Sequence, residues 1–502
     1  MQVVVTGEEM KNIDNYTIQS IGIPSMVLME RAAWSMVQKM LPYLEEKTQV
    51  LAVCGSGNNG GDGVAVARIL HGMGYSAAIY MMGSTDKWTE ETKSQIQIAR
   101  NIGVPEYNEL DLTSVQVVVD GLFGIGLDRM IKEPYESLIN YLNQWRDAKE
   151  EHKIWSVDIP SGVSAKNGQV LGTAVCADYT VTFGYMKCGL VLYPGRSKAG
   201  VCYVEDIGFP KKALYDHFPK GFSMDQSDMD KLPKRSMDSN KGDYGKILVI
   251  AGSKNMSGAA YFAAYAAYVM GAGLVRILTV EANRQILQTA LPQAMISVWE
   301  ELNDEELEKT LKWASSVIIG PGIGTDSCME NRLDKILYKI KCPIVLDADG
   351  LNLLARNKMW YDKMKARLVV TPHMGEMFRL TGCSIDELKS DRAAWAAHFA
   401  KEHEVVCVLK DSSSVISDGE RICYQRTGND GMSTGGSGDI LAGMIGSLVG
   451  MGCDLFIASC LSAYIHGCAG DHARELYGAR AMTSVEIIDG LKAVLKKIEN
   501  RG

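Results

Sequence analysis

Aspartates follow two β-type runs in the first half of the chain, and a turn that contains glycine comes after each of them. In a parallel sheet the carboxyl ends of the strands face the ligand crevice, where a carboxylate can transfer a proton or bind a cation. Asp120 or Asp158 alone could equally cap a turn. Their recurrence beside an asparagine-rich loop favours a functional site. The hard oxygen ligands of Asn59, Asp120 and Ser161 would suit an alkali or alkaline-earth ion.

The asparagine-rich loop spans residues 55–63, between a β-type run and the helical pattern of residues 64–72. Its glycines would let the backbone approach a ligand, and the helix N–H groups could then meet a phosphate. Three of them match the G-x-G-x-x-G spacing, but no acidic residue ends the next β-type run, which argues against a hydride-transfer site. The structural alternative is a tight turn capped by Asn and Asp.

In the second half, residues 434–439 read Thr-Gly-Gly-Ser-Gly-Asp and enter the apolar helical run 440–449. A glycine-rich turn at a helix start presents free N–H groups to a transferring phosphoryl group, and Asp439 could take a hydroxyl proton. Alternatively, Ser437 or Asp439 merely caps the helix. The chain has no G-x-x-x-x-G-K-[ST] tract, which excludes P-loop chemistry.

Two further tracts of the second half carry polar groups after β-type runs. Lys410 to Ser414 offers donors for a nucleotide phosphate, although an ordinary turn rich in Asp and Ser would read the same. His373 lies on an expected loop. Its side chain could equally contact a ligand or form a structural hydrogen bond.

The elements that must position these residues follow an alternation of buried β-type runs and helical patterns. Continuous Val/Ile/Leu runs separated by helices are typical of parallel sheets covered on both faces. The expected strands are residues 50–54, 77–82, 115–120, 154–158 and 179–183, then 246–251, 275–279, 316–320, 344–347, 368–371 and 405–410. Residues 209–240 contain three prolines and no sustained periodicity, so a linker is expected there. The pattern predicts two α/β domains, residues 1–218 and 224–502.

The composition, 46% hydrophobic and 22% charged, excludes disorder and a multi-span membrane protein. The net charge of −8, with no basic block, argues against a nucleic-acid partner. Residues 255–275 carry no charge and are long enough to span a membrane, but their Ala and Gly content suits a helix packed close under a sheet. No targeting pattern precedes the first domain, so we expect a cytoplasmic protein without a membrane partner.

None of the 12 cysteines forms a Cys-x-x-Cys pair. Cys54, Cys407 and Cys423 lie inside apolar β-type runs, which predicts buried thiols in a reducing compartment rather than disulfides or a structural zinc.

Four ordered tracts of the first half, residues 57–63, 120–126, 157–162 and 177–183, resemble the NAD(P)H-hydrate epimerase domain family. The resemblance implies a Rossmann-like sheet that binds damaged nicotinamide nucleotide, a K⁺ ion near Asn59, Asp120 and Ser161, and Asp158 as the proton-transferring residue. The substrate-binding residues that it implies are Asn58, Asn59, Gly60, Gly61, Asp62, Gly124, Ile125, Gly126, Leu127, Asp128, Arg129, Met130 and Asp158.

The second half resembles the ribokinase-like fold and, more closely, the nucleotide-dependent NAD(P)H-hydrate dehydratase domain, through six ordered motifs over residues 241–439. The resemblance implies substrate contacts from Ala259, Gly322, His373 and Asp439. It implies that adenine nucleotide is held by Lys410, Asp411, Ser412, Ser413, Ser414 and Gly438, with ADP favoured because bacterial members use it. Asn240 stands where the family usually has His, and the turn at residues 411–413 is unusually polar, which bears on nucleotide specificity.

Both halves then imply one pathway, acting on the hydrated nucleotides NADHX and NADPHX. The first domain would interconvert their R and S epimers with Asp158 as the acid/base. The second would phosphorylate the hydrate from ADP with Mg²⁺ and with Asp439 as base, and loss of phosphate would restore NAD(P)H and leave AMP. One alternative is a ribokinase-like small-molecule kinase fused to a nucleotide-binding regulatory domain; another is a non-enzymatic binding or scaffold protein. A homo-oligomer is the expected assembly state.

Overall fold

The computed structural model describes residues 1–364 and 366–499. These residues form two compact units, one from Gln2 to Phe222 and one made of the described residues from Ser223 onward, and Met1 groups with the second. Its terminal amine forms ion pairs with Asp225 at 3.1 Å and Asp228 at 2.8 Å, which explains that grouping.

The first unit contains a seven-stranded parallel sheet. In spatial order its strands are β4 (Glu106–Tyr107), β3 (Ser76–Met81), β2 (Gln49–Cys54), β5 (Val117–Gly121), β6 (Lys153–Val157), β7 (Tyr179–Phe183) and β9 (Val201–Glu205). A separate parallel pair joins β1 (Gln2–Val5) to β8 (Met186–Lys187).

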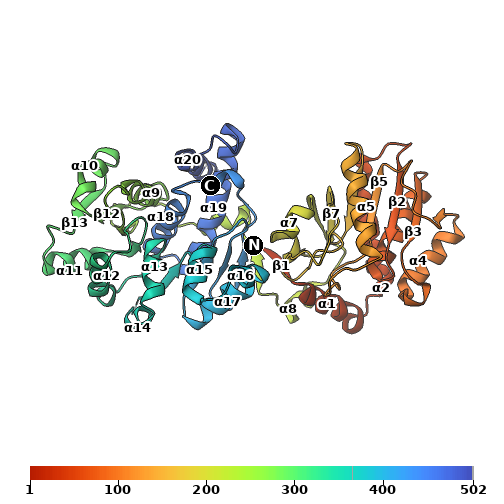
Figure 1. Ribbon diagram of the computed structural model, residues 1–502, viewed down its shortest axis with the longest axis horizontal. Coiled ribbons are helices and arrows are strands. Elements are labelled where there is room, and N and C mark those ends of the chain that lie inside the picture. Colours follow the sequence, from red (N-terminus) through yellow and green to blue (C-terminus); the bar gives the residue numbers. More distant parts are fainter. Residues whose placement is uncertain (365, 500–502) are drawn as a thin grey trace. The chain divides into compact units, whose positions relative to one another are not determined.

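Helices cover both faces of this sheet because successive strand residues point to opposite sides. Val50 and Ala52 of β2 belong to a core with α2 and α3, whereas Leu51 and Val53 belong to a core with α5. Figure 1 shows β5, β2 and β3 between α5 and α4. The helices are α1 (Gly7–Asn15), the π-helix η1 (Tyr16–Ile21), α2 (Ser25–Met40), η2 (Leu41–Tyr43), α3 (Asn58–Gly72), η3 (Thr85–Lys87), α4 (Glu90–Asn101), α5 (Tyr135–Ala148), α6 (Cys188–Val191), α7 (Gly195–Lys198) and α8 (Lys211–Asp216).

The second unit is also built on a largely parallel sheet, and this sheet is larger. Its parallel strands are, in spatial order, β13 (Met295–Val298), β12 (Leu274–Thr279), β11 (Lys246–Ile250), β14 (Ser316–Ile319), β15 (Ile344–Leu346), β16 (Leu368–Val370) and β17 (Val406–Leu409). The strands β18 (Val415–Ser417) and β19 (Ile422–Tyr424) continue it in antiparallel fashion.

Helices of the second unit include α9 (Ser257–Val269), which packs against α18 (Ser437–Gly450) with small residues at the contact (Figure 1). A Cβ on Gly443 would stand 2.2 Å from the carbonyl oxygen of Ala263, so only glycine fits there. The remaining helices are η4 (Gln226–Lys231), α10 (Glu281–Ala290), α11 (Asp304–Trp313), α12 (Ser327–Ile336), η5 (Leu337–Lys339), α13 (Asp349–Arg356), α14 (Trp360–Lys363), α15 (Met374–Thr381), α16 (Ile385–Ser390), α17 (Arg392–Glu402), η6 (Asp430–Met432), α19 (Leu455–Tyr477) and α20 (Ser484–Glu499).

The expected parallel α/β architecture is confirmed, and every expected strand is present within one or two residues. Two details differ from expectation. Helix α3 begins at Asn58, inside the tract expected as a loop, and the segment expected as a linker folds into α8, β10 (Gly221–Ser223) and η4. Among the described residues, no helix has the length and apolar character needed to cross a membrane. The predicted buried thiols Cys54, Cys407 and Cys423 are buried and free.

Candidate active sites

A cavity of about 550 Å³ opens at the carboxyl ends of β2 and β5, the two strands at which the order of the first sheet reverses. Crevices at such switch points are the usual ligand sites of open parallel sheets. Ten residues predicted from the sequence line it: Asn58, Asn59, Asp62, Gly124, Ile125, Gly126, Leu127, Asp128, Arg129 and Asp158.

Three predicted substrate contacts do not line this cavity. A Cβ on Gly60 would stand 1.9 Å from the carbonyl oxygen of Gly55, and one on Gly61 would stand 2.8 Å from Met29 Cε. These two glycines therefore allow α3 to pack closely against its surroundings, and their substrate contact stays a prediction. Met130 is exposed and lies outside the cavity wall.

Asp158 follows β6 and adopts a left-handed backbone conformation, with φ of 65°, that non-glycine residues rarely take. Its carboxylate accepts hydrogen bonds from Lys187 Nζ at 2.5 Å and from Thr182 Oγ1 and Phe183 N at 3.0 Å each. Lys187 is 1% exposed and Asp158 is 9% exposed, so this ion pair is buried at the cavity wall. The strained backbone and the ion pair together fix the carboxylate in one position.

Sequence reasoning missed Lys187 and a second cavity residue, Asp14 of α1. A usable signal existed for the lysine, which is the one charged residue between Asp178 and Arg196 in an otherwise apolar stretch. A lysine in such a context needs a buried partner. The amphipathic helix α1 gave no comparable signal for Asp14, because acidic residues on surface helices are common.

Two of the predicted cation ligands, Asp120 and Ser161, are hydrogen-bonded to each other outside the cavity lining. Asp120 is fully buried, and its carboxylate accepts hydrogen bonds from Ser161 Oγ at 2.6 Å, Ser161 N at 2.9 Å and Ser156 Oγ at 2.7 Å. Burial raises its pKa, which these donors partly oppose. The third predicted ligand, Asn59, lies against the loop after β5, since a Cβ on Gly124 would stand 2.9 Å from Asn59 Oδ1. Its buried Nδ2 has no hydrogen-bond partner among the described residues.

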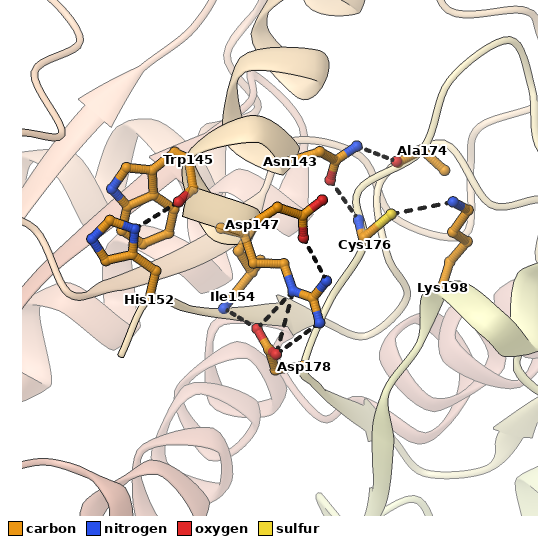
Figure 2. Close-up of polar contacts among 10 residues, drawn as sticks. Asn143, Trp145, Asp147, His152, Ile154, Ala174, Cys176, Asp178 and Lys198 are labelled. Atoms are coloured by element: carbon orange, nitrogen blue, oxygen red, sulfur yellow. Dashed lines mark hydrogen bonds and ion pairs between the residues drawn. The ribbon is translucent and has the colours of Figure 1, made fainter. Parts of the chain in front are cut away.

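The amino-terminal ends of β6 and β7, at the edge of the sheet away from the cavity, have a different role. The carboxylate of Asp178 accepts hydrogen bonds from Arg146 of α5 and from the backbone of Ile154, and Figure 2 shows Asp178 next to Ile154. Arg146 Nη2 donates to it at 3.0 Å and Ile154 N at 2.8 Å. This contact ties α5 to the start of β6, away from the cavity, so Asp178 serves the fold.

In the second unit, Asp439 lies in the first turn of α18, whose N-cap Gly436 has φ of 95°. The pKa of Asp439 is raised to about 7, first by burial and then by the nearby charge of Asp347, while Lys410 opposes the shift. A carboxyl with a pKa near neutrality is matched to general-base work at physiological pH.

Asp347 and Lys410 form a buried pair beside this turn. Lys410 Nζ lies 2.6 Å from Asp347 Oδ1, and Thr371 Oγ1 donates to the same oxygen at 2.6 Å. A Cβ on Gly438 would stand 3.4 Å from Lys410 Nζ, which places the ammonium directly against the helix start. Sequence reasoning assigned no role to Asp347, although it ends a strand.

A cavity of about 680 Å³ adjoins the same helix start. Its wall includes the predicted residues Lys410, Asp411, Ser412, Ser414, Gly438 and His373. Ser413 is buried and does not line it. Ala259 and Gly322 also lie outside its wall but are packed together, since a Cβ on Gly322 would stand 3.0 Å from Ala259 Cβ. Asp439 follows Gly438 directly, next to this cavity rather than in its lining.

His373 has a structural hydrogen bond and also faces the cavity. It is the N-cap of α15, where its Nδ1 accepts from Gly375 N at 2.9 Å and Glu376 N at 3.3 Å. Burial and the charge of Lys410 lower its pKa, which fits a neutral ring with the proton on Nε2. His466 of α19, which sequence reasoning missed, lines the same cavity, and burial lowers its pKa to about 4.

Comparison with known proteins assigns both units. Residues 25–189 match the family model of the YjeF-related protein N-terminus, and residues 247–493 match that of NAD(P)H-hydrate dehydratase. The chain is similar to the bifunctional NAD(P)H-hydrate repair enzyme Nnr of Thermofilum pendens, with 34% identity over 98% of this chain and 95% of that protein. The protein of the same name from Escherichia coli K12 is 34% identical over 95% of this chain and 90% of its own length.

Among solved structures, a ribokinase-like superfamily protein from Enterococcus faecalis superposes with a TM-score of 0.51 and 25% identity, over 56% of this chain and 97% of that protein. Both domains are thus matched in order, and the full-length relatives align from end to end. The chain belongs to the family of bifunctional NAD(P)H-hydrate repair enzymes.

Proposed function

We propose that residues 1–218 epimerise the R and S forms of NADHX and NADPHX, and that residues 224–502 dehydrate the S form to NAD(P)H at the expense of ADP, releasing AMP and phosphate. The observation that carries this function is that each domain has a cavity with an aspartate at it: Asp158 lines the first cavity, and Asp439, whose pKa is raised to about 7, lies next to the second.

In the epimerase, Asp158 is the proton-transferring group. Its three donors hold the carboxylate at one point of the cavity wall, which is the orientation that general acid–base catalysis requires. The N–H groups at the start of α3, next to Asn58 and Asn59, favour the negative charge of the substrate's phosphates.

The residues around Asp120 fit a K⁺ ion. Asp120 is buried among neutral donors with no cation among the groups that perturb it, and the amide of Asn59 lacks a full set of partners. A monovalent cation held by Asn59, Asp120 and Ser161 would offset the buried charge and supply a fixed positive field beside the cavity.

Replacing Asp120 by Asn is expected to raise the K⁺ concentration needed for half-maximal epimerisation by about 10–100-fold, a range typical of damaged metal sites. The check is a KCl titration of the epimerase rate at constant ionic strength. A second readout is the melting temperature, which KCl should raise above its value in NaCl for the parent protein but not for the variant. Asp86→Asn, at an exposed carboxylate of the same unit, is the control. An unchanged K⁺ response would remove Asp120 from the cation site.

In the dehydratase, Asp439 accepts the proton of the hydrate hydroxyl as a phosphoryl group is transferred to it. Lys410 and the N–H groups at the start of α18 face the cavity where the nucleotide phosphates would lie. Phosphorylation converts hydroxide into a better leaving group, which explains the use of a nucleotide. No group of three or more His, Cys, Asp or Glu side chains in the described part of the chain could hold a metal. Mg²⁺ would therefore be bound mainly through the phosphates.

The dehydratase kcat/KM is expected to rise with pH through an apparent pKa of about 7, because Asp439 must be ionised to act as a base and its pKa is raised to about 7. The measurement is NADH formation from S-NADHX and ADP, at substrate concentrations below KM, from pH 5.5 to 8.5. A rate that is flat over this interval would contradict Asp439 as the base.

Product analysis tests the whole proposal. Protein, R-NADHX and ADP should yield NADH absorbance together with AMP and free phosphate. A stable phosphorylated product would favour the small-molecule kinase, and binding without turnover would favour a scaffold. We further propose that the protein is cytoplasmic, because its buried free thiols suit a reducing compartment. We also propose that it forms a homo-oligomer, which is the usual form of soluble oligomers.

A further inference from the structure

Four carboxyl groups line the epimerase cavity, those of Asp14, Asp62, Asp128 and Asp158, and two of them, Asp62 and Asp158, are in opposite chemical environments. Asp158 accepts three hydrogen bonds, one of them from the buried ammonium of Lys187. Asp62, in the second turn of α3, lines the same cavity but forms no side-chain hydrogen bond or ion pair with any residue in 1–364 or 366–499. Lys187 thus balances the charge of Asp158, whereas the carboxyl group of Asp62 has no such partner among these residues.

The groups that face Asp62 disfavour its ionised form. Burial raises its pKa well above the ordinary value, and the nearby charges of Asp158 and Asp14 raise it further. The titratable or charged groups that line the cavity with Asp62 are Lys11 and Asp14 of α1, Asp128 and Arg129 after β5, Asp158 after β6 and Lys187 of β8. Cys54 of β2 is also close, since the charges of Asp62 and Asp120 both act on its thiol. Lys187 forms its ion pair with Asp158. Lys11 and Arg129 are exposed, and neither is among the groups that shift the pKa of Asp62.

Deepening the proposed epimerase function, on which this inference rests, we infer that Asp62 is the catalytic proton donor that works opposite Asp158. Pairs of titratable groups whose environments push their protonation apart are the usual acid and base of an active site. A neutral carboxyl supplies the proton, and the carboxylate paired with Lys187 accepts one.

The step balances without an external reactant. Asp158 takes the proton of the 6-hydroxyl group while Asp62 gives its proton to the ring nitrogen N1, and the C6–N1 bond breaks to leave an aldehyde at C6 and an enamine N–H. Rotation about the C5–C6 bond presents the other face of the carbonyl. N1 then attacks C6, its proton returns to Asp62, and Asp158 returns its proton to the oxygen, which gives the other epimer.

Asp14 is the rival donor, because it lines the same cavity and burial raises its pKa too. Lys187 partly offsets this shift at Asp14, whereas it is absent from the groups that perturb Asp62. The nearby charges therefore favour Asp62 over Asp14 as the carboxyl that keeps its proton.

The test compares Asp62→Asn with the matched variant Asp14→Asn in the full-length protein. Pure R-NADHX is converted with excess separate dehydratase, and kcat and KM are determined at saturating KCl. Asp62→Asn is expected to lower kcat by about 10²–10⁴-fold with little change in KM, and Asp14→Asn by less than about tenfold. The parent kcat should fall at alkaline pH as Asp62 loses its proton, and the residual rate of Asp62→Asn should lack this fall.

A higher KM at unchanged kcat for Asp62→Asn would reduce the residue to a binding role and overturn the inference. Loss of kcat in Asp14→Asn instead would move the donor to α1. Partial recovery of kcat in Asp62→Glu would support a proton donor, and full activity of Asp62→Asn would exclude one. Dehydratase activity on S-NADHX reports that each preparation is folded. If the parent protein itself fails to convert R-NADHX, the proposed function fails, and that outcome is distinct from those of the variants.

Discussion

Replacing Asp439 by Asn is expected to lower ADP-dependent dehydration of S-NADHX by about 10²–10⁴-fold, the usual loss when a general base is removed. Asparagine has nearly the same size and can still cap a helix, but it cannot accept the hydroxyl proton. Since the carboxyl is buried beside Asp347, removing its charge should not lower the melting temperature. The measurement is NADH formation at saturating ADP and Mg²⁺.

The same preparation supplies the control for this variant. Its epimerase rate from R-NADHX, assayed with excess separate dehydratase, should equal that of the parent protein, because Asp439 belongs to the other domain. Near-native turnover of the S epimer by Asp439→Asn would refute its role as the base.

Replacing Asp158 by Asn is expected to slow the conversion of R to S at saturating K⁺ by about 10²–10⁴-fold. The substitution also leaves the ammonium of Lys187 buried without its carboxylate, and breaking a buried pair from one side costs about 3–5 kcal/mol of stability. The assay is NADH recovery from pure R epimer with excess separate dehydratase, corrected for uncatalysed epimerisation.

A double variant separates catalysis from this loss of stability. Asp158→Asn combined with Lys187→Met removes both charges, so the melting temperature should recover while the epimerase rate stays low. If Asp158→Asn converts R-NADHX as fast as the parent protein and Asp120→Asn is inactive at every K⁺ concentration, the roles of the two aspartates are reversed.

The comparison of α3 with its sequence shows how tertiary contacts override local preference. Four glycines and two asparagines between residues 55 and 61 predict a loop, because glycine is a poor helix former. The helix nonetheless begins at Asn58, and its Gly60 approaches the backbone of Gly55 too closely for any side chain. The packing of the helix decides its start.

By itself, the sequence determined the two parallel α/β domains and the carboxylates at strand ends and at a helix start, because strand alternation, glycine-rich turns and apolar runs are local patterns. Only the tertiary structure decided which charges meet. Lys187 is 29 residues from Asp158 and Lys410 is 63 residues from Asp347, and neither separation follows from a local period. The order of the strands brings these groups together, and burial then sets their protonation. That is why the structure identifies the ion-pair partner of Asp158 and the raised pKa values of Asp439 and Asp62, whereas the sequence predicted the aspartates without their partners.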